Sequence, residues 1–275
     1  MQLSGLERRR PPSIRSREGL ASPGVDPQSD PERSRAMARI EAFEDHCWRG
    51  MIDEDTMAIY AAYARETYVG ANPALIAIDL YNAVYRGGPK PPVELEAEFP
   101  GSCGVNAWSA LEPTKRLLAA ARSANVPIFY CTTETRPQSR PSARITGTLR
   151  QRTTSFADDF IIHPELSPEP QDVIITKQRA SIFAGTPLIS HLSYLGIRSL
   201  IVCGESTSGC VRASCVDGYS NGYHVTLVEE CTFDRSDLIH KINMFDLHHK
   251  YADVMKIDEV LEHLARLASH RVAAE

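Results

Sequence analysis

Cys210 stands in surroundings that suit a nucleophile. It lies in the string GESTSGCVRAS, residues 204–214, which follows the apolar run SLIVC, and small hydroxyl residues and a glycine flank it. A cysteine placed where a strand ends and a helix begins is close to unpaired backbone N–H groups and to the positive end of the helix dipole, and both lower the pKa of its thiol. We therefore expect Cys210 to be reactive. We expect Cys203, Cys215 and Cys231, which fall within predicted strands or helices, to be buried core residues.

A carboxylate and an ammonium group could complete such a site. Asp79 ends the apolar run ALIAID, and Lys177 ends the run DVIITK. An ammonium group beside a thiol stabilises the thiolate, and a carboxylate can accept the thiol proton and later deliver it to a leaving amine. Taken singly, a strand-terminal Asp is more often a helix cap and a strand-terminal Lys is more often solvated. Three matching residue types at three strand ends favour a catalytic site.

The elements that must position these residues alternate along the chain. Short apolar runs are typical of buried parallel strands, and they occur at 74–79, 126–133, 172–177, 199–205, 224–230 and 253–257. Helical patterns separate most of them. This alternation predicts an α/β fold, a doubly wound six-stranded parallel sheet flanked by helices on both faces. In such sheets the active site forms at the carboxyl ends of the strands, where Asp79, Lys177 and Cys210 are expected.

The composition of the chain limits the kinds of partner that it could bind. A net charge of −5 gives no basic surface for nucleic acid, and no stretch approaches the roughly 18 to 20 apolar residues of a membrane span. Seven cysteines without a secretory segment indicate free thiols in a reducing compartment. We therefore expect a cytoplasmic protein that binds a small molecule, and neither nucleic acid nor a membrane.

The N-terminal part differs from the rest of the chain. Residues 1–36 are rich in Arg, Ser and Pro and poor in large apolar residues, which predicts a disordered tail. Residues 37–70 carry aromatic residues such as Trp48 in a helical pattern and are predicted to form a helical arm. Residues 71–275 then form the α/β domain.

The sequence lacks the motifs that are typical of serine hydrolases, nucleotide-binding proteins and metal sites. A nucleophile elbow, G-x-S-x-G, would need glycine at the position of Ser208. Neither G-x-G-x-x-G nor a P-loop occurs, so no nucleotide cofactor is expected. His248 and His249 are adjacent on a predicted helix and do not share a face, so they are not expected to bind a metal.

The strings GESTSGCVRAS, TKQRASIFAGTPL and FDLHHKYADV resemble the isochorismatase-like cysteine hydrolases, over roughly residues 70 to 270. Within that family they are most similar to the branch that hydrolyses N-carbamoylsarcosine or maleamate. The resemblance implies a three-layer fold and a catalytic triad of Asp79, Lys177 and Cys210. It also implies a cis peptide bond between Glu205 and Ser206, and an oxyanion hole formed by the N–H groups of Ser206 and Cys210.

The resemblance further implies how substrate is held. Arg235 is expected to bind a carboxylate of the substrate and Thr207 to contact it, although an unplaced arginine is more often a surface residue, here paired with Asp234 or Asp237. Residues 80–99 lack the histidines that hold zinc in nicotinamidases, so no metal is expected. Glu205 departs from the small or apolar residue usual in relatives, and a side chain facing the pocket would change the preferred substrate charge.

These residues together predict a metal-free cysteine amidohydrolase without a cofactor. It would cleave a C–N bond of a small linear carboxamide or ureido acid, through a thioester, and release ammonia. Two alternatives stay open, an isochorismatase-type hydrolase of another small acid, which would not need Cys210, and an inactive scaffold. The family also implies a homo-oligomer, a tetramer or dimer, in which residues 37–68 form part of an interface, and the alternative is that this segment packs only on its own subunit.

Overall fold

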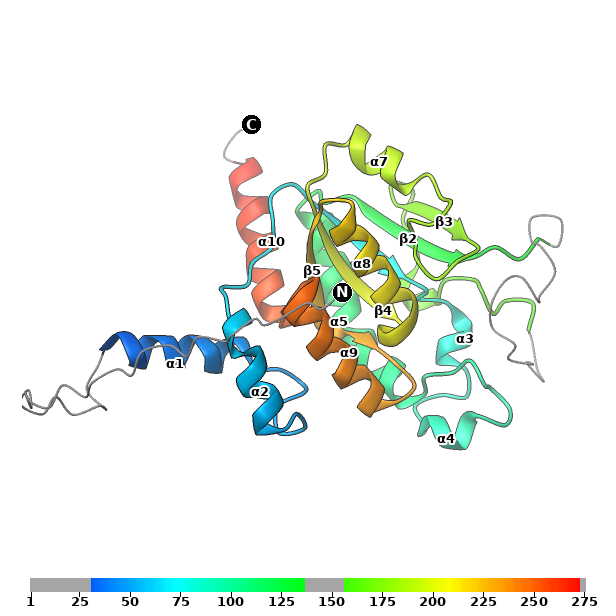
Figure 1. Cartoon of the computed structure of the whole chain (residues 1–275). Helices are drawn as coiled ribbons and strands as arrows, with labels where there is room; N and C mark the ends of the chain where they lie inside the picture. The colour runs from blue at the N-terminus through cyan, green and yellow to red at the C-terminus, as the bar shows by residue number, and fades with distance from the viewer. Residues whose placement is uncertain (1–30, 137–155, 273–275) are drawn as a thin grey trace, which may run out of the picture. The chain divides into compact units, whose positions relative to one another are not determined.

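Six parallel strands form one sheet in the order β3-β2-β1-β4-β5-β6. The computed structural model describes residues 31–136 and 156–272 (Figure 1). The strands are β1 (Pro73–Ile78), β2 (Ile128–Thr133), β3 (Val173–Lys177), β4 (Ser199–Glu205), β5 (His224–Phe233) and β6 (Asp253–Met255). The predicted parallel sheet is confirmed, with strand ends shifted by a few residues.

Helices cover both faces of the sheet (Figure 1). The principal helices after β1 are α5 (Val105–Ser123), α7 (Leu188–Tyr194), α8 (Arg212–Ser220), α9 (Asp237–Lys250) and α10 (Ile257–Val272). Short elements fill the connections: α2 (Glu54–Tyr60), α3 (Asn82–Tyr85), α4 (Pro92–Leu95), 3-10 turns at Ala61–Tyr63 and Pro164–Leu166, and a π turn at Thr207–Val211. None of the helices in the described ranges is long and apolar enough to cross a membrane.

Two hydrophobic cores form because β1 is covered on both sides. Every residue of β1 is buried. Leu75 and Ala77 belong to the core beneath α5 and α10, whereas Ile76 and Ile78 belong to the core beneath α7, α8 and α9. Alternate residues of a strand point to opposite faces, so a strand buried on both faces must be apolar throughout.

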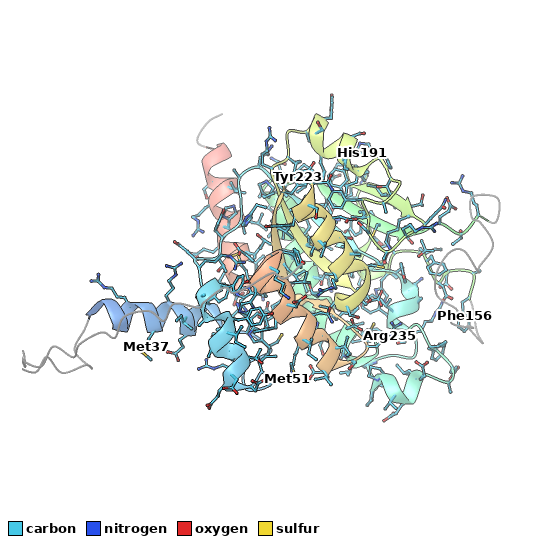
Figure 2. The ribbon with its side chains drawn as sticks, viewed as in Figure 1. Met37, Met51, Phe156, His191, Tyr223 and Arg235 are labelled. Atoms are coloured by element: carbon cyan, nitrogen blue, oxygen red, sulfur yellow. The ribbon has the colours of Figure 1, made fainter. Side chains whose placement is uncertain are left out.

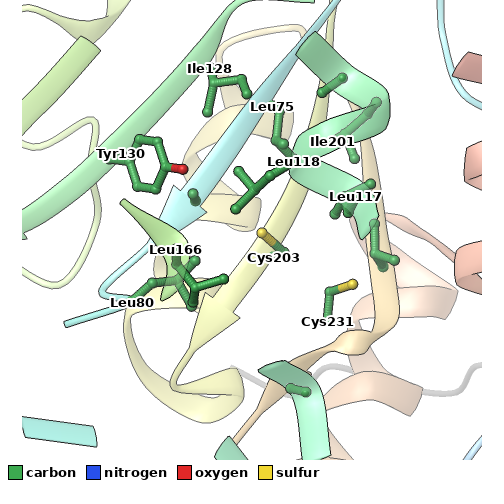
Figure 3. Packing of buried hydrophobic residues seen from close by; sticks show 14 of the residues in the cluster. Leu75, Leu80, Leu117, Leu118, Ile128, Tyr130, Leu166, Ile201, Cys203 and Cys231 are labelled. Atoms are coloured by element: carbon green, nitrogen blue, oxygen red, sulfur yellow. The ribbon is translucent and has the colours of Figure 1, made fainter. Parts of the chain in front are cut away.

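Figure 3 shows the first core, where Leu117 and Leu118 of α5 lie near Leu75. The thiols of Cys203 and Cys231 are in the same core, and Cys215 is in the other. The expectation that these three cysteines are buried is confirmed.

The N-terminal segment begins with helix α1 (Pro31–Phe43). Of the predicted disordered tail, residues 1–30 lie outside the described residues, and residues 31–36 already belong to α1. The chain divides into two units, residues 1–38 and 39–275. The sheet and the arm from residue 39 onward belong to the second unit.

The arm packs on α9 of its own subunit. Trp48 is fully buried, with its ring 5.9 Å from that of Phe245. Its Nε1 donates to Glu44 at 2.9 Å, and the other Glu44 oxygen lies 2.9 Å from Nε2 of His249. Burial opposes a charge on Glu44, but the hydrogen bonds from His249 and Trp48 outweigh it and hold the pKa of this carboxyl below its usual range. This is the packing that the alternative described, and a role of the arm in an oligomer stays a prediction.

Candidate active site

Asp79, Lys177 and Cys210 come together at the carboxyl edge of the sheet. Asp79 follows β1 and Lys177 closes β3, and both side chains are almost fully buried. Lys177 Nζ lies 2.8 Å from Asp79 Oδ2 and donates to Cys210 Sγ at 3.2 Å. Asp79 caps no helix, since α3 begins after Tyr81, and Lys177 is not solvated. Both alternative interpretations of these two residues are therefore wrong.

The backbone and the intervening strand position Asp79. Its φ of +53° lies in the left-handed region, which Asp and Asn tolerate better than most residues. β2 lies between β1 and β3, and Cys131 of β2 donates a hydrogen bond to Asp79 Oδ1 at 3.4 Å. One carboxylate oxygen thus faces the ammonium group and the other faces a thiol.

The Cys210 thiol is protonated in the resting site. Burial raises the pKa of Cys210 to about 12, and the Asp79 carboxylate adds to this, while Lys177 opposes it. The expectation of a lowered pKa was therefore wrong, because desolvation of the thiolate outweighs the nearby ammonium group. For Lys177 burial disfavours the charge, but Asp79 outweighs it, and the pKa of Lys177 is raised. The site rests as a neutral thiol beside a carboxylate–ammonium pair.

The loop before Cys210 is tightly folded. The Glu205–Ser206 peptide bond is cis, as the resemblance implied. The Ser206 carbonyl accepts hydrogen bonds from the N–H groups of Gly209 at 2.9 Å and Val211 at 3.2 Å. A Cβ on Gly209 would lie 2.4 Å from Ser206 Oγ, so a side chain at this position would force the Ser206 hydroxyl to move. Ser206 and Cys210 thus lie at the two ends of one short turn.

Two residues that the sequence analysis missed hold this loop from outside. Asp234, directly after β5, accepts from Ser208 N at 2.9 Å and Ser208 Oγ at 2.7 Å. His240 of α9 has its Nδ1 2.7 Å from the Thr207 hydroxyl. The one available signal was the position of Asp234 at the same sheet edge as the other site residues. The Thr207 side chain is fully buried, and the contact with substrate that was expected of it stays a prediction.

Arg235 lies in the turn between β5 and α9 and is half-buried (Figure 2). Neither acidic neighbour forms an ion pair with its guanidinium: Asp234 Oδ1 accepts from the Arg235 backbone N–H at 2.8 Å, and Asp237 pairs with Lys241 at 2.8 Å. The alternative of a surface arginine paired with one of these aspartates is therefore wrong.

His248 of α9 contacts backbone groups of neighbouring segments. His248 accepts from Val254 N at 3.0 Å through Nδ1, and its Nε2 lies 3.0 Å from the Phe43 carbonyl. Burial lowers the pKa of His248 to about 2. Within residues 31–136 and 156–272, no group of three or more His, Cys, Asp or Glu side chains is placed to hold a metal ion.

Solved structures share the fold. A cysteine hydrolase from Pseudomonas syringae pv. phaseolicola superposes with a TM-score of 0.60 at 20% identity, over 74% of this chain and 97% of that chain. At this identity the likeness concerns the fold alone.

Sequence comparison defines the family. The isochorismatase domain model matches residues 73–259. A maleamate amidohydrolase from Pseudomonas putida is 32% identical over 72% of this chain and 90% of the relative. An N-carbamoylsarcosine amidase from an Arthrobacter species is 31% identical over 74% of this chain and 76% of the relative. The chain belongs to the isochorismatase family.

Proposed function

We propose that this protein is a cysteine amidohydrolase that cleaves the C–N bond of a small linear carboxamide or ureido acid and releases ammonia. The observation that carries the proposal is the contact of the Lys177 ammonium with both the Cys210 sulfur and the Asp79 carboxylate. This arrangement supplies a nucleophile, a proton acceptor and a fixed positive charge. The two amidase relatives support the reaction class.

The proposed reaction starts from the neutral thiol. Asp79 accepts the thiol proton, and the Lys177 ammonium stabilises the thiolate that forms. Cys210 Sγ then bonds to the amide carbon, and the carbonyl π electrons move to the oxygen. The developing oxyanion would accept hydrogen bonds from the backbone N–H groups of Ser206 and Cys210. The C–N bond breaks, Asp79 returns the proton to the nitrogen, and ammonia leaves a thioester. Water, deprotonated by Asp79, then attacks the thioester, and breakage of the C–S bond regenerates the thiol and the free acid.

Ammonia release and thiol labelling together test this function. We expect ammonia from at least one member of a panel of carbamoyl amino acids, maleamate, biuret and ureidoacrylate. An inactive scaffold would release none. Mass spectrometry after iodoacetamide treatment should find Cys210 labelled before Cys47, the other cysteine that is not fully buried. The Lys177 ammonium contacts the Cys210 sulfur, whereas the Glu229 carboxylate opposes a thiolate at Cys47. The pKa values of both thiols are raised to about 12, so labelling should rise about tenfold per pH unit through neutral pH. Equal labelling of the two cysteines together with no ammonia would contradict the proposal.

Arg235 is proposed to bind a carboxylate of the substrate. A guanidinium presents two parallel donors to a carboxylate, which an ammonium group cannot do. We expect Arg235→Lys to lower kcat/KM for acid substrates about tenfold to a hundredfold, since a charge-assisted hydrogen bond is worth roughly 1.5 to 3 kcal/mol. Neutral amides of the same length should lose little. Equal losses on acids and neutral amides, measured in parallel, would assign Arg235 a structural role instead.

A further inference from the structure

Glu205 places a buried carboxyl group at the active site without a strong hydrogen-bond donor. It ends β4, pairs with Phe233 of β5 in the sheet and is only 6% exposed. Among the described residues, the side chain within hydrogen-bonding distance is Cys103, whose Sγ lies 3.8 Å from Oε1. A thiol is a weak hydrogen-bond donor. Cys103 therefore stabilises neither the neutral nor the ionised form of Glu205 strongly.

Charges from several elements act on this carboxyl. Burial is the largest influence and raises its pKa, Asp79 after β1 and Asp234 after β5 also raise it, and Arg235 and Lys177 lower it. The result is a pKa of about 8.

The charge of Glu205 also acts on three further groups, the phenols of Tyr81 and Tyr85 and the thiol of Cys210. The pKa values of all three are raised, so they are neutral near pH 8. Glu205 is therefore protonated near neutral pH and becomes a carboxylate as the solution turns alkaline.

Arg235 and Lys177 are the two cations that act on Glu205, and Lys177 is already paired with Asp79. In the described part of the chain the Arg235 guanidinium forms no ion pair, because Asp234 holds Ser208 and Asp237 holds Lys241. Glu205 pairs with Phe233, two residues before Arg235, so both residues lie at the same edge of the sheet. The charges of both act on the Cys103 thiol, which lies 3.8 Å from Glu205.

We propose that Glu205 determines whether the site accepts an anionic substrate. When Glu205 is protonated, the Arg235 guanidinium is free to bind a substrate carboxylate; when Glu205 is ionised, it occupies that cation and excludes the acid. This inference rests on the proposed function, because it takes Arg235 as the group that binds the carboxylate. It goes beyond the triad, since Glu205 acts on which substrate enters and not on the bond that breaks.

The kinetic consequence separates binding from chemistry. If an acid binds only to the form with protonated Glu205, its KM rises about tenfold per pH unit above the midpoint. An ionised Glu205 also adds negative charge near Cys210 and Asp79, which would lower kcat for every substrate. The effect of Glu205 on binding is therefore measured by comparing the pH dependence of KM for an acid with that for a neutral amide of the same shape.

Steady-state kinetics on maleamate and its neutral diamide, from about pH 6 to about pH 9, tests the inference. For the unmodified enzyme, KM for maleamate should rise above about pH 8 while KM for the diamide stays level. Glu205→Gln should abolish the rise. The control is Asp237→Asn, which removes an exposed carboxylate two residues after Arg235 and should keep it. A rise that persists in Glu205→Gln, or that both substrates share, would overturn the inference.

Carboxyl NMR of enzyme labelled with ¹³C-glutamate tests the pairing without turnover. The Glu205 signal is identified by its absence from Glu205→Gln. We expect Arg235→Gln to raise its titration midpoint, and the dicarboxylate maleate to raise it in the unmodified enzyme, because coupling between two ligands of one site is reciprocal. An unchanged midpoint in Arg235→Gln would overturn the inference and leave the proposed amidase function standing. A shifted midpoint with no amide hydrolysed would overturn the proposed function and support the Glu205–Arg235 pair.

Discussion

Replacing Cys210 with alanine is expected to abolish turnover, by a factor of about 10³ or more, since no other group in the site can form the covalent intermediate. The loss should appear in kcat, because the substrate-binding groups are untouched. Cys210 is half-buried and its side chain is small, so removing the sulfur opens no large cavity, and the free energy of unfolding should change by no more than about 1 kcal/mol. Ammonia release and urea denaturation measure the two quantities.

Two companion variants complete this test. Cys47→Ala removes the other half-buried thiol and should leave turnover unchanged. Cys210→Ser should be nearly inactive, because an alkoxide forms much less readily than a thiolate in the same surroundings. Substantial ammonia release by Cys210→Ala would exclude the covalent mechanism.

Lys177→Met is expected to remove activity and also to destabilise the fold. Asp79 is 1% exposed and would lose the ammonium group that now lies 2.8 Å away. Removing one partner of a buried ion pair costs about 3–5 kcal/mol, because the other charge stays buried without compensation. Turnover should fall as well, because the thiolate of Cys210 would form beside no positive charge. Urea denaturation and ammonia release measure the two losses.

The double variant Asp79→Asn, Lys177→Met distinguishes the two effects. Both charges are then absent, so most of the lost stability should return, whereas the activity should not, since the site has no proton acceptor. A double variant no more stable than Lys177→Met would show that this contact does not act as an ion pair.

The sheet and the position of the site were predictable because they depend on local patterns. Buried parallel strands must be apolar on both faces, and β1 and β4 have such sequences. A rule about sheet edges then brings Asp79 and Lys177 together although about a hundred residues separate them in the chain. Residue types at and after strand ends therefore predicted that these three side chains meet, and the structure brings them together.

The protonation and the hydrogen bonds of the site residues depend on three-dimensional surroundings that no local sequence pattern describes. The sequence indicated a lowered pKa for Cys210 from its place at a helix start, but burial and Asp79 dominate. The hydrogen bond between Thr207 and His240 joins two segments whose side-chain directions are fixed only by packing. For the same reason, the sequence could state only as a condition that the Glu205 side chain faces the pocket.

The arm on α9 extends the compact unit of this protein beyond the family match. The family match starts at residue 73, yet α9 relies on Trp48 and Glu44 to cover Phe245 and to bind His249. The same helix carries His240, which contacts Thr207 in the loop before Cys210. The segment ahead of the first strand is therefore joined through α9 to this loop, and the compact unit, residues 39–275, is longer than the family match.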